Sequence, residues 1–296
     1  MKILVTGSTG FVGSALVSML TGTGHQVTRL VRKPAAAGEV QWDPAAGSID
    51  AGGLEGHDAV VHLAGENIAG RWTAAKKQRI RDSRVIGTRL LAEALAKLSR
   101  RPRALICASA IGYYGDRGDE TLREDSPPGK GFLAETCVEW EAAAKPAADA
   151  GLRLVHLRIG VVLHPAGGAL KQMLLPFKLG AGGVIGSGRQ YMSWIALDDL
   201  VGIAQHALAN DSLRGPANAV APNPATNREF TKTLGKVLSR PTIFPMPAFA
   251  ARLAFGEMAD ELLLSSARVE PARLAASGYR FAYPQLEPAL RHLLGR

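Results

Sequence analysis

The amino-acid sequence predicts a doubly wound α/β protein with a parallel central sheet and a smaller C-terminal lobe. Apolar runs of strand length alternate with amphipathic stretches of helix length, and the strand runs are nearly continuous in apolar residues. Such runs are typical of parallel strands that are covered on both faces. Right-handed crossovers between them give a Rossmann-type domain. A change in composition follows, because seven of the 27 residues in 164–190 are glycine.

The expected elements follow from these runs in chain order. Strands are predicted at 2–7, 26–32, 57–65, 103–110 and 152–163, with helices at 11–24, 73–98 and 132–150 between them. A proline-rich segment, 240–247, precedes a further helical stretch at 248–269. We therefore assign 1–164 to the dinucleotide-binding Rossmann domain, which also receives segments from about 190–225. Residues 165–296 form the smaller substrate-side lobe.

Length and composition exclude several classes of protein. A chain of 296 residues that is 47% hydrophobic and 21% charged buries a sizeable core, which excludes disordered and fibrous proteins. Its two cysteines form no CxxC pair, which fits a reducing compartment and supplies no zinc ligand set, so we expect no metal. No apolar run approaches the roughly 18 residues of a membrane span. We expect a cytoplasmic protein with no membrane partner, and a homodimer stays open.

The positive charge is concentrated in one segment. Residues 71–103 hold eleven Lys and Arg against Asp82 and Glu93, which accounts for the whole net charge of +9. The segment lacks the interleaved aromatic residues of single-strand nucleic-acid platforms, so nucleic acid is not the expected partner. We interpret it as a solvated helix face on which one arginine, Arg84, lies near a cofactor phosphate.

The segment "TGSTGFVG" predicts a phosphate-binding loop. Gly7, Gly10 and Gly13 follow the first strand directly and open the first helix. Glycines are needed there for a tight turn, for the approach of backbone N–H groups to a pyrophosphate, and for close packing of helix and strand. The helix N-terminus then offers donors and a partial positive charge to the phosphates. Thr9 belongs to the same loop.

The end of the second strand indicates which dinucleotide is bound. An acidic residue at this point would bind a ribose 2′-hydroxyl, whereas an arginine would accept a 2′-phosphate. The sequence reads "LVRKP", with Arg32 and Lys33 and no acidic residue. We therefore predict NADP(H) as the cofactor.

The motifs "TGSTGFVG", "HDAVVHLAGENI" and "SAIGYYGD" resemble those of the extended short-chain dehydrogenase/reductase superfamily. The stretches "HLAGENIAGRWTAAKKQRIRDSRVIGT", "LPFKLGAGGVIGSGRQYMSWIALDDL" and "RVEPARLAASGYRF" resemble its atypical branch of epimerase family proteins, which carry a C-terminal domain of unknown function. The likeness spans essentially the whole chain and identifies 241–296 with that domain. Some members of the branch are linked to cell or plastid division.

The resemblance also implies roles for individual residues. It places Gly7, Gly10, Phe11 and Val12 at the pyrophosphate, Arg32 at the 2′-phosphate, and Leu63, Ala64 and Gly65 beside the adenosine and ribose. Ser109 falls where the superfamily has its catalytic serine or threonine.

The usual acid–base pair of the superfamily, Tyr-x-x-x-Lys, is absent. Phe132 stands where the tyrosine is expected and Thr136 where the lysine is expected, so neither a phenol nor an ammonium is supplied there. Tyr113 and Tyr114, next to Ser109, are the alternative sources of a phenol. All three remain candidates for catalysis, with packing or a turn hydrogen bond as the competing interpretation.

On the substrate side, the glycine-rich segment with Arg189 and Trp194 is a candidate lid. Arg189 suits a phosphate or carboxylate, and Trp194 is a second candidate contact. Our leading hypothesis is an NADP(H)-binding oxidoreductase or epimerase that acts on a small polar or sugar-like substrate. The alternative is an NADP(H)-sensing regulatory or binding protein without turnover, with a link to cell division. A third hypothesis is an adaptor that binds nucleic acid or the division apparatus through the basic segment.

Overall fold

The computed structural model describes residues 1–33 and 35–296, and its centre is an eight-stranded sheet in the order β12-β8-β6-β5-β1-β2-β3-β4. All neighbouring strands are parallel except β3 and β4. The strands span β1 Lys2–Thr6, β2 Gln26–Val31, β3 Glu39–Asp43, β4 Ser48–Ile49, β5 Ala59–His62, β6 Ala104–Ala110, β8 Arg153–Ile159 and β12 Gly215–Ala219. The chain builds the sheet outward from β1, first through β2, β3 and β4 on one side and then through β5, β6, β8 and β12 on the other. This is the doubly wound arrangement predicted from the sequence.

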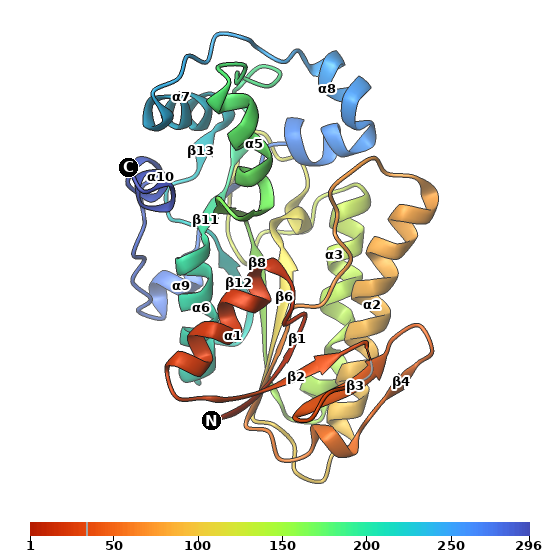
Figure 1. Cartoon of the computed structure of the whole chain (residues 1–296). Helices are drawn as coiled ribbons and strands as arrows, with labels where there is room; N and C mark the ends of the chain where they lie inside the picture. Colours follow the sequence, from red (N-terminus) through yellow and green to blue (C-terminus); the bar gives the residue numbers. More distant parts are fainter. Residues whose placement is uncertain (34) are drawn as a thin grey trace.

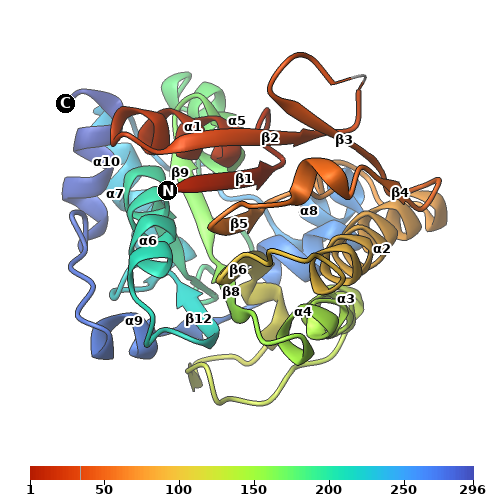
Figure 2. The ribbon, with the colours of Figure 1, turned by 90° about the horizontal axis from the view of Figure 1, so that it is seen from below.

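Helices cover both faces of the sheet, as Figures 1 and 2 show. One face carries α1 (Phe11–Gly22) and α6 (Leu197–Ala209), and the other carries α2 (Ala74–Ala96), α3 (Phe132–Ala143) and α4 (Lys145–Asp149). Side chains from alternate strand positions go to opposite layers, so Ile3 and Val5 pack with α1 while Leu4 packs with α2. The two hydrophobic layers hold the sheet between them.

Three predicted elements are broken in the structure. The helical stretch expected at 248–269 divides into α8 (Ala248–Phe255), which ends at Gly256 with φ +61°, and the π-helix Ala259–Leu264, and its last two residues form the strand β14 (Arg268–Val269). The single strand expected at 152–163 divides at Gly160 into β8 and β9 (Val161–His164), and β9 pairs with β11 (Trp194–Ala196) outside the main sheet. A Cβ at Gly160 would lie 2.6 Å from the Ser193 carbonyl oxygen, so only glycine allows this crossing. The helix expected at 132–150 divides into α3 and α4, because Pro146, which has no backbone N–H to donate, lies in the first turn of a new helix.

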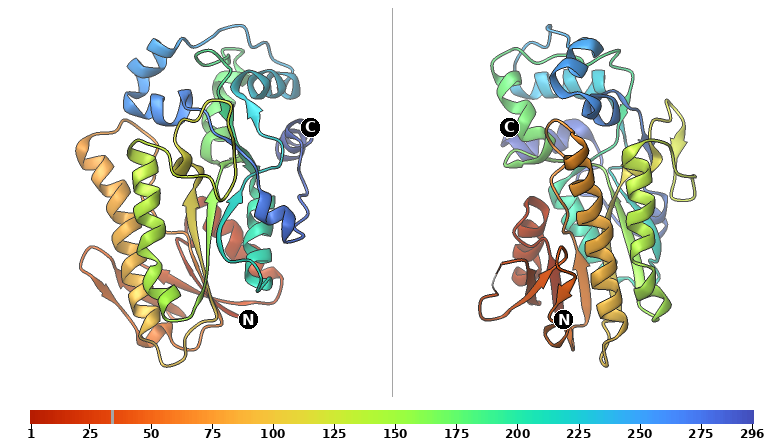
Figure 3. Two further views of the ribbon diagram at one scale, coloured as in Figure 1. Left: turned by 180° about the vertical axis from the view of Figure 1, so that it is seen from behind. Right: turned by 90° about the vertical axis from the view of Figure 1, so that its right-hand side faces the viewer.

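Helices α5 (Gly168–Lys178), α7 (Asn227–Leu238) and α8 (Ala248–Phe255) lie at the carboxyl edge of the sheet, at the top of Figure 1, whereas α9 (Ala272–Ala276) lies lower, beside α6 and β12. The views in Figure 3 show the long helices α2 and α3 running side by side towards this edge. The last helix is α10 (Leu286–Leu294). Short strands and 3₁₀ turns complete the chain: η1 Gly52–Leu54, η2 Ile111–Tyr114, β7 Thr121–Leu122, β10 Tyr191–Met192, β13 Ala225–Thr226 and β14 Arg268–Val269.

The lobe is tied to the Rossmann layers by polar contacts. Asp199, at the start of α6, is almost fully buried and accepts hydrogen bonds from the backbone N–H groups of Ala282 and Tyr283 and from the Tyr279 hydroxyl. Lys77 of α2 forms a 2.9 Å ion pair with Glu257. No helix in the described part of the chain is long and apolar enough to cross a bilayer.

Candidate functional site

The glycine loop between β1 and α1 has the geometry that a phosphate site requires. Gly7 has φ +65°, and a Cβ there would lie 2.7 Å from the Leu63 carbonyl carbon. A Cβ at Gly13 would lie 2.1 Å from the Gly7 carbonyl oxygen, and the Gly10 N–H donates to that same oxygen at 2.9 Å. Any side chain at Gly7 or Gly13 would therefore open the turn. No side chain within the described residues caps the start of α1, so its first N–H groups remain available to a ligand. Thr9 and Gly10 are exposed on this turn.

A buried hydrogen-bond network holds residues 63–65 against this loop. The Thr6 hydroxyl accepts from the Leu63 and Ala64 N–H groups at 3.1 and 3.2 Å and lies 2.7 Å from His62 Nδ1. Burial lowers the pKa of His62 to about 4, so the ring is neutral near pH 7. Because Thr6 already accepts two N–H groups, its hydroxyl donates to Nδ1, and Nε2–H donates to Thr88 at 2.9 Å. The segment predicted to lie beside the adenosine is thus fixed by β1 and α2.

Of the two arginines predicted near the cofactor, Arg84 contacts this segment, whereas Arg32 forms no hydrogen bond to it within the described residues. The Arg84 guanidinium donates to the carbonyls of Glu66 and Ile80, both at 3.0 Å, and stacks over the Trp140 ring. A Cβ at Gly65 would lie 3.3 Å from its central carbon, so Arg84 supports the loop from beneath. Arg32 follows β2 directly and is exposed. Arg32 is therefore available to an incoming anion, whereas the Arg84 guanidinium already donates to two carbonyl groups.

The three candidate catalytic residues belong to a second polar network at the carboxyl ends of β6 and β8. Ser109 is 2% exposed and donates to Glu141 Oε1 at 2.7 Å. Glu141 also forms a bidentate ion pair with Arg158, at 2.8 and 2.9 Å. Burial alone would lower the pKa of Arg158, but its bonds to Glu141 outweigh burial and raise it, so the guanidinium stays charged.

Arg158 connects this pair to both tyrosines. Its Nη1 donates to the Tyr114 hydroxyl at 3.0 Å, and its guanidinium carbon lies 3.5 Å from the centre of the Tyr113 ring. Tyr114 is fully buried and donates to Asn218 Oδ1 at 2.7 Å; burial raises the pKa of its phenol. Tyr113 is half-buried, and its hydroxyl has no hydrogen-bond partner within residues 1–33 and 35–296. Of the three hydroxyls, those of Ser109 and Tyr114 are engaged inside the protein.

The positions of the absent Tyr-x-x-x-Lys pair are used for packing. Phe132 is the first residue of α3, and its ring meets Trp72 edge-on with centroids 5.4 Å apart. Met258 and Phe255 of the lobe join the same apolar cluster. Thr136 is buried one turn further along α3. The lobe therefore covers the place where the superfamily has its usual acid.

Arg189 and Trp194 lie in different surroundings. Arg189 is exposed and lines a pocket of about 350 Å³ with Asp119, Ser187, Gln190 and Ser266. Trp194 is fully buried, and its indole N–H donates to the Asn223 carbonyl at 3.1 Å. Trp194 thus packs the core, and contact with a substrate would require it to leave that position.

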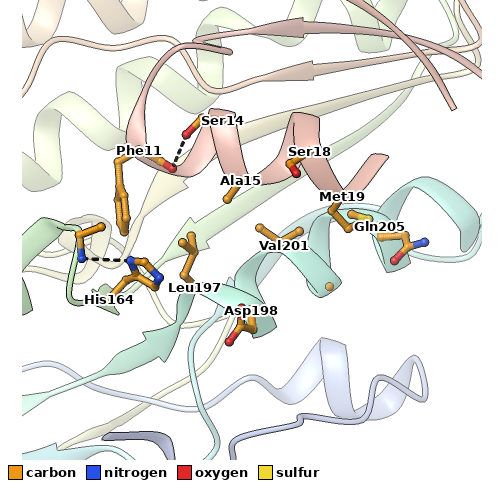
Figure 4. Close-up of a pocket in the computed structure, with 12 residues that line it drawn as sticks. Phe11, Ser14, Ala15, Ser18, Met19, His164, Leu197, Asp198, Val201 and Gln205 are labelled. Carbon is orange, nitrogen blue, oxygen red and sulfur yellow. Dashed lines mark hydrogen bonds between the residues drawn. The ribbon is translucent and has the colours of Figure 1, made fainter. Parts of the chain in front are cut away.

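A second groove, of about 720 Å³, runs between α1 and α6 (Figure 4). The Phe11 ring points into it towards His164, at a centroid distance of 5.7 Å, and Ala15 and Val201 line its floor. Phe11 therefore turns its side chain away from the phosphate loop, to which it contributes its backbone. The Phe11 ring thus packs against His164 at the end of β9.

The sequence did not reveal Glu141, Arg158, Asn218 and Glu124, which hold the network together. Glu124 is buried and accepts from the N–H groups of Asn218 and Arg273. The one available signal was Arg158, a charged residue inside a strand-like run, which requires a buried partner. In the described part of the chain, no three His, Cys, Asp or Glu side chains gather as a metal site.

These features define an α/β protein of the dinucleotide-binding Rossmann type, with a close-packed glycine turn after β1 and no acidic residue directly after β2. The chain belongs to the NAD dependent epimerase/dehydratase family, whose model matches residues 3–220; a domain of unknown function, DUF1731, matches residues 246–293. Epimerase family protein Mb2239 of Mycobacterium bovis is 45% identical over 99% of this chain and 98% of its own length. Epimerase family protein SDR39U1 of Homo sapiens is 42% identical over 99% of this chain and all of its own length.

One of the similar solved structures contains a bound dinucleotide. The human protein SDR39U1 (isoform 2), crystallised with NADPH, superposes with a TM-score of 0.91 at 40% identity and covers 100% of this chain and 99% of the other. The expected membership of the epimerase family branch, with its C-terminal domain, is thereby confirmed, as is the fold.

Proposed function

We propose that this protein binds NADP(H) with its pyrophosphate on the N-terminus of α1 and its 2′-phosphate at Arg32. The observation that carries this proposal is the close-packed glycine turn at Gly7 and Gly13 after β1, together with an exposed Arg32 and no carboxylate directly after the neighbouring strand β2. The NADPH in the human relative supports the same choice of cofactor. Gly7, Thr9, Gly10, Phe11, Val12 and Gly13 supply the turn, Leu63, Ala64 and Gly65 the adenosine side, and Arg84 the support beneath them.

A titration of the purified protein with NADPH and with NADH, followed by the fluorescence of the reduced nicotinamide, tests this proposal. A 2′-phosphate bound by an arginine is worth roughly 1.5–3 kcal/mol, so NADPH is expected to bind at least about tenfold more tightly than NADH. Arg32→Gln is expected to remove most of that difference. Equal affinity for the two dinucleotides in the unmodified protein contradicts the assignment of Arg32.

We further propose an oxidoreductase or epimerase reaction, in which hydride passes between the nicotinamide and a carbon of a small polar or sugar-like substrate. When bound, the dinucleotide supplies the hydride chemistry, and the protein supplies orientation and a proton donor. Tyr113 is the best placed of the three candidate hydroxyls, because its oxygen is not engaged within the described residues. Ser109 and Tyr114 act through Glu141 and Arg158 to hold it.

A second function, NADP(H) sensing without turnover, is favoured by a specific observation. Phe132 and Thr136 replace the usual acid and its lysine, and the lobe packs over the first of them. Oxidation of NADPH by any member of a panel of carbonyl compounds and sugar nucleotides separates the two functions. Turnover that depends on Tyr113 supports the enzyme, whereas tight NADPH binding with no turnover across the panel supports the sensor.

The adaptor hypothesis is weakened at three cations of the basic segment. Lys76 and Lys77 pair with Glu66 and Glu257, and Arg81 pairs with Glu139. Cations that are paired within the protein are less available to a nucleic acid.

A further inference from the structure

Two cations near the start of α2, Lys76 and Arg79, lie close to Glu66 in the segment that follows β5. Lys76 Nζ lies 2.9 Å from Glu66 Oε1, and Arg79 Nε lies 3.8 Å from the same oxygen. The Lys76 side chain is only 15% exposed, so its ammonium is held near the loop before any ligand arrives. Glu66 immediately follows Gly65 in the segment beside the predicted adenosine position.

Glu66 is fixed by its backbone as well as by its side chain. Its N–H donates to Ser83 Oγ at 2.9 Å, and its carbonyl accepts from Arg84. Its carboxylate therefore occupies a defined position above α2. The bond to Lys76 lowers the pKa of Glu66, with smaller contributions from Arg79 and Arg32, so the carboxylate is charged near pH 7.

Arg32 comes from a different element but leaves the same edge of the sheet as Glu66. In the sheet, β5 and β2 are the two neighbours of β1, so Arg32 after β2 and Glu66 after β5 leave the same edge on either side of the glycine loop. Lys76 and Arg79 pair with Glu66, and Arg32 adds a third cation at the same edge of the sheet, so three cations and one carboxylate leave an excess of positive charge there. A phosphate monoester carries about −1.5 to −2 at pH 7, which balances that excess.

We propose that Lys76 and Arg79 complete, with Arg32, the binding site for the 2′-phosphate of NADP(H), and that Glu66 holds the two α2 cations in place for it. This inference rests on the proposed cofactor. The inference goes beyond the proposed cofactor, because it assigns the discrimination between NADPH and NADH to residues of α2 as well as to Arg32 after β2. Arg32 and the neighbouring exposed Lys33 would otherwise have to provide all of this discrimination.

The test uses isothermal titration of the full chain with 2′,5′-ADP and with 5′-AMP, two probes that differ only in the 2′-phosphate. Lys76→Met and Arg79→Met are each expected to weaken 2′,5′-ADP binding roughly three- to tenfold and to change 5′-AMP binding less than about twofold. The matched control is Lys77→Met, because Lys77 is the next residue on α2 and pairs instead with Glu257 of the lobe. It is expected to leave both affinities unchanged within about twofold.

Three outcomes overturn the inference. Unchanged binding of 2′,5′-ADP by the Lys76 and Arg79 variants shows that α2 takes no part. Equal weakening of both probes shows that these residues only position the loop. If Lys77→Met loses as much affinity for 2′,5′-ADP as Lys76→Met does, the effect comes from the overall positive charge of α2 and not from a specific contact. If the unmodified protein binds neither probe, the proposed cofactor fails instead, which separates the two claims.

Discussion

Glu141 and Arg158 form a bidentate ion pair between α3 and β8, with oxygen–nitrogen distances of 2.8 and 2.9 Å and side chains 14% and 3% exposed. Glu141 accepts a hydrogen bond from the Ser109 hydroxyl. Arg158 donates to the Tyr114 hydroxyl and lies over the Tyr113 ring. The pair is the centre of the network in which the candidate catalytic residues meet. Removing one partner leaves the other charge buried without compensation.

Glu141→Ala is therefore expected to reduce the free energy of unfolding by about 3–5 kcal/mol, measured by urea denaturation. Asp149→Asn is the matched control, because it breaks the exposed Lys145–Asp149 pair on α4 and should cost less than about 1 kcal/mol. Similar losses of unfolding free energy in the two variants would show that the buried Glu141–Arg158 pair contributes no more to stability than an exposed ion pair.

The hydroxyl series distinguishes chemistry from packing. If the protein turns over a substrate, Tyr113→Phe is expected to lower kcat by about 10²-fold or more with little change in stability, because its hydroxyl makes no bond within the described residues. Tyr114→Phe is expected to reduce the free energy of unfolding by about 1–3 kcal/mol, because Asn218 and Arg158 lose a partner. A fall in kcat for Tyr114→Phe alone, with Tyr113→Phe unaffected, would reverse these roles.

The glycine loop gives a prediction on binding. A Cβ at Gly13 would lie 2.1 Å from the Gly7 carbonyl oxygen, so Gly13→Ala must displace the turn that faces the pyrophosphate. We expect it to weaken NADPH binding by at least about tenfold. Gly22→Ala, at the other end of α1 where a Cβ meets nothing within 4 Å, should bind NADPH normally. Unimpaired binding by Gly13→Ala would exclude this turn as the phosphate site.

His62 predicts a dependence of stability on pH. Its pKa is near 6.5 in the unfolded chain and about 4 in the folded protein, so the unfolded state takes up a proton first as the pH falls. Stability attributable to His62 is complete above about pH 6.5 and decreases as the pH falls towards 4, by about 3 kcal/mol in total. NMR of the histidine rings tests this directly. The His62 ring should remain the neutral tautomer protonated at Nε2 down to about pH 5, and protonation near pH 6.5 would contradict the network with Thr6 and Thr88.

The sequence was sufficient for the Rossmann layers and the glycine loop because their signals are local. Strand-length apolar runs, the spacing of Gly7, Gly10 and Gly13, and the absence of an acid after β2 are all visible within a few residues. The break at Gly160 was not visible, because it depends on a close approach of the Ser193 backbone from a different segment.

The polar network depended on contacts far apart in the chain. Ser109, Glu141 and Arg158 come from three elements, and only the packing of α3 against β6 and β8 brings them together. Nothing local distinguishes Tyr113 from Tyr114, although one ring is half-buried and the other fully buried. Trp194 looked like a cleft residue because of its glycine-rich neighbours, yet β11 directs it into the core.

A crystal structure of the protein with NADPH tests the central claim most directly. The account predicts a dinucleotide whose pyrophosphate lies on the backbone of the Gly7–Gly13 turn, with the 2′-phosphate within hydrogen-bond distance of Arg32. A dinucleotide bound elsewhere, or a 2′-phosphate that faces solvent away from Arg32, would contradict it.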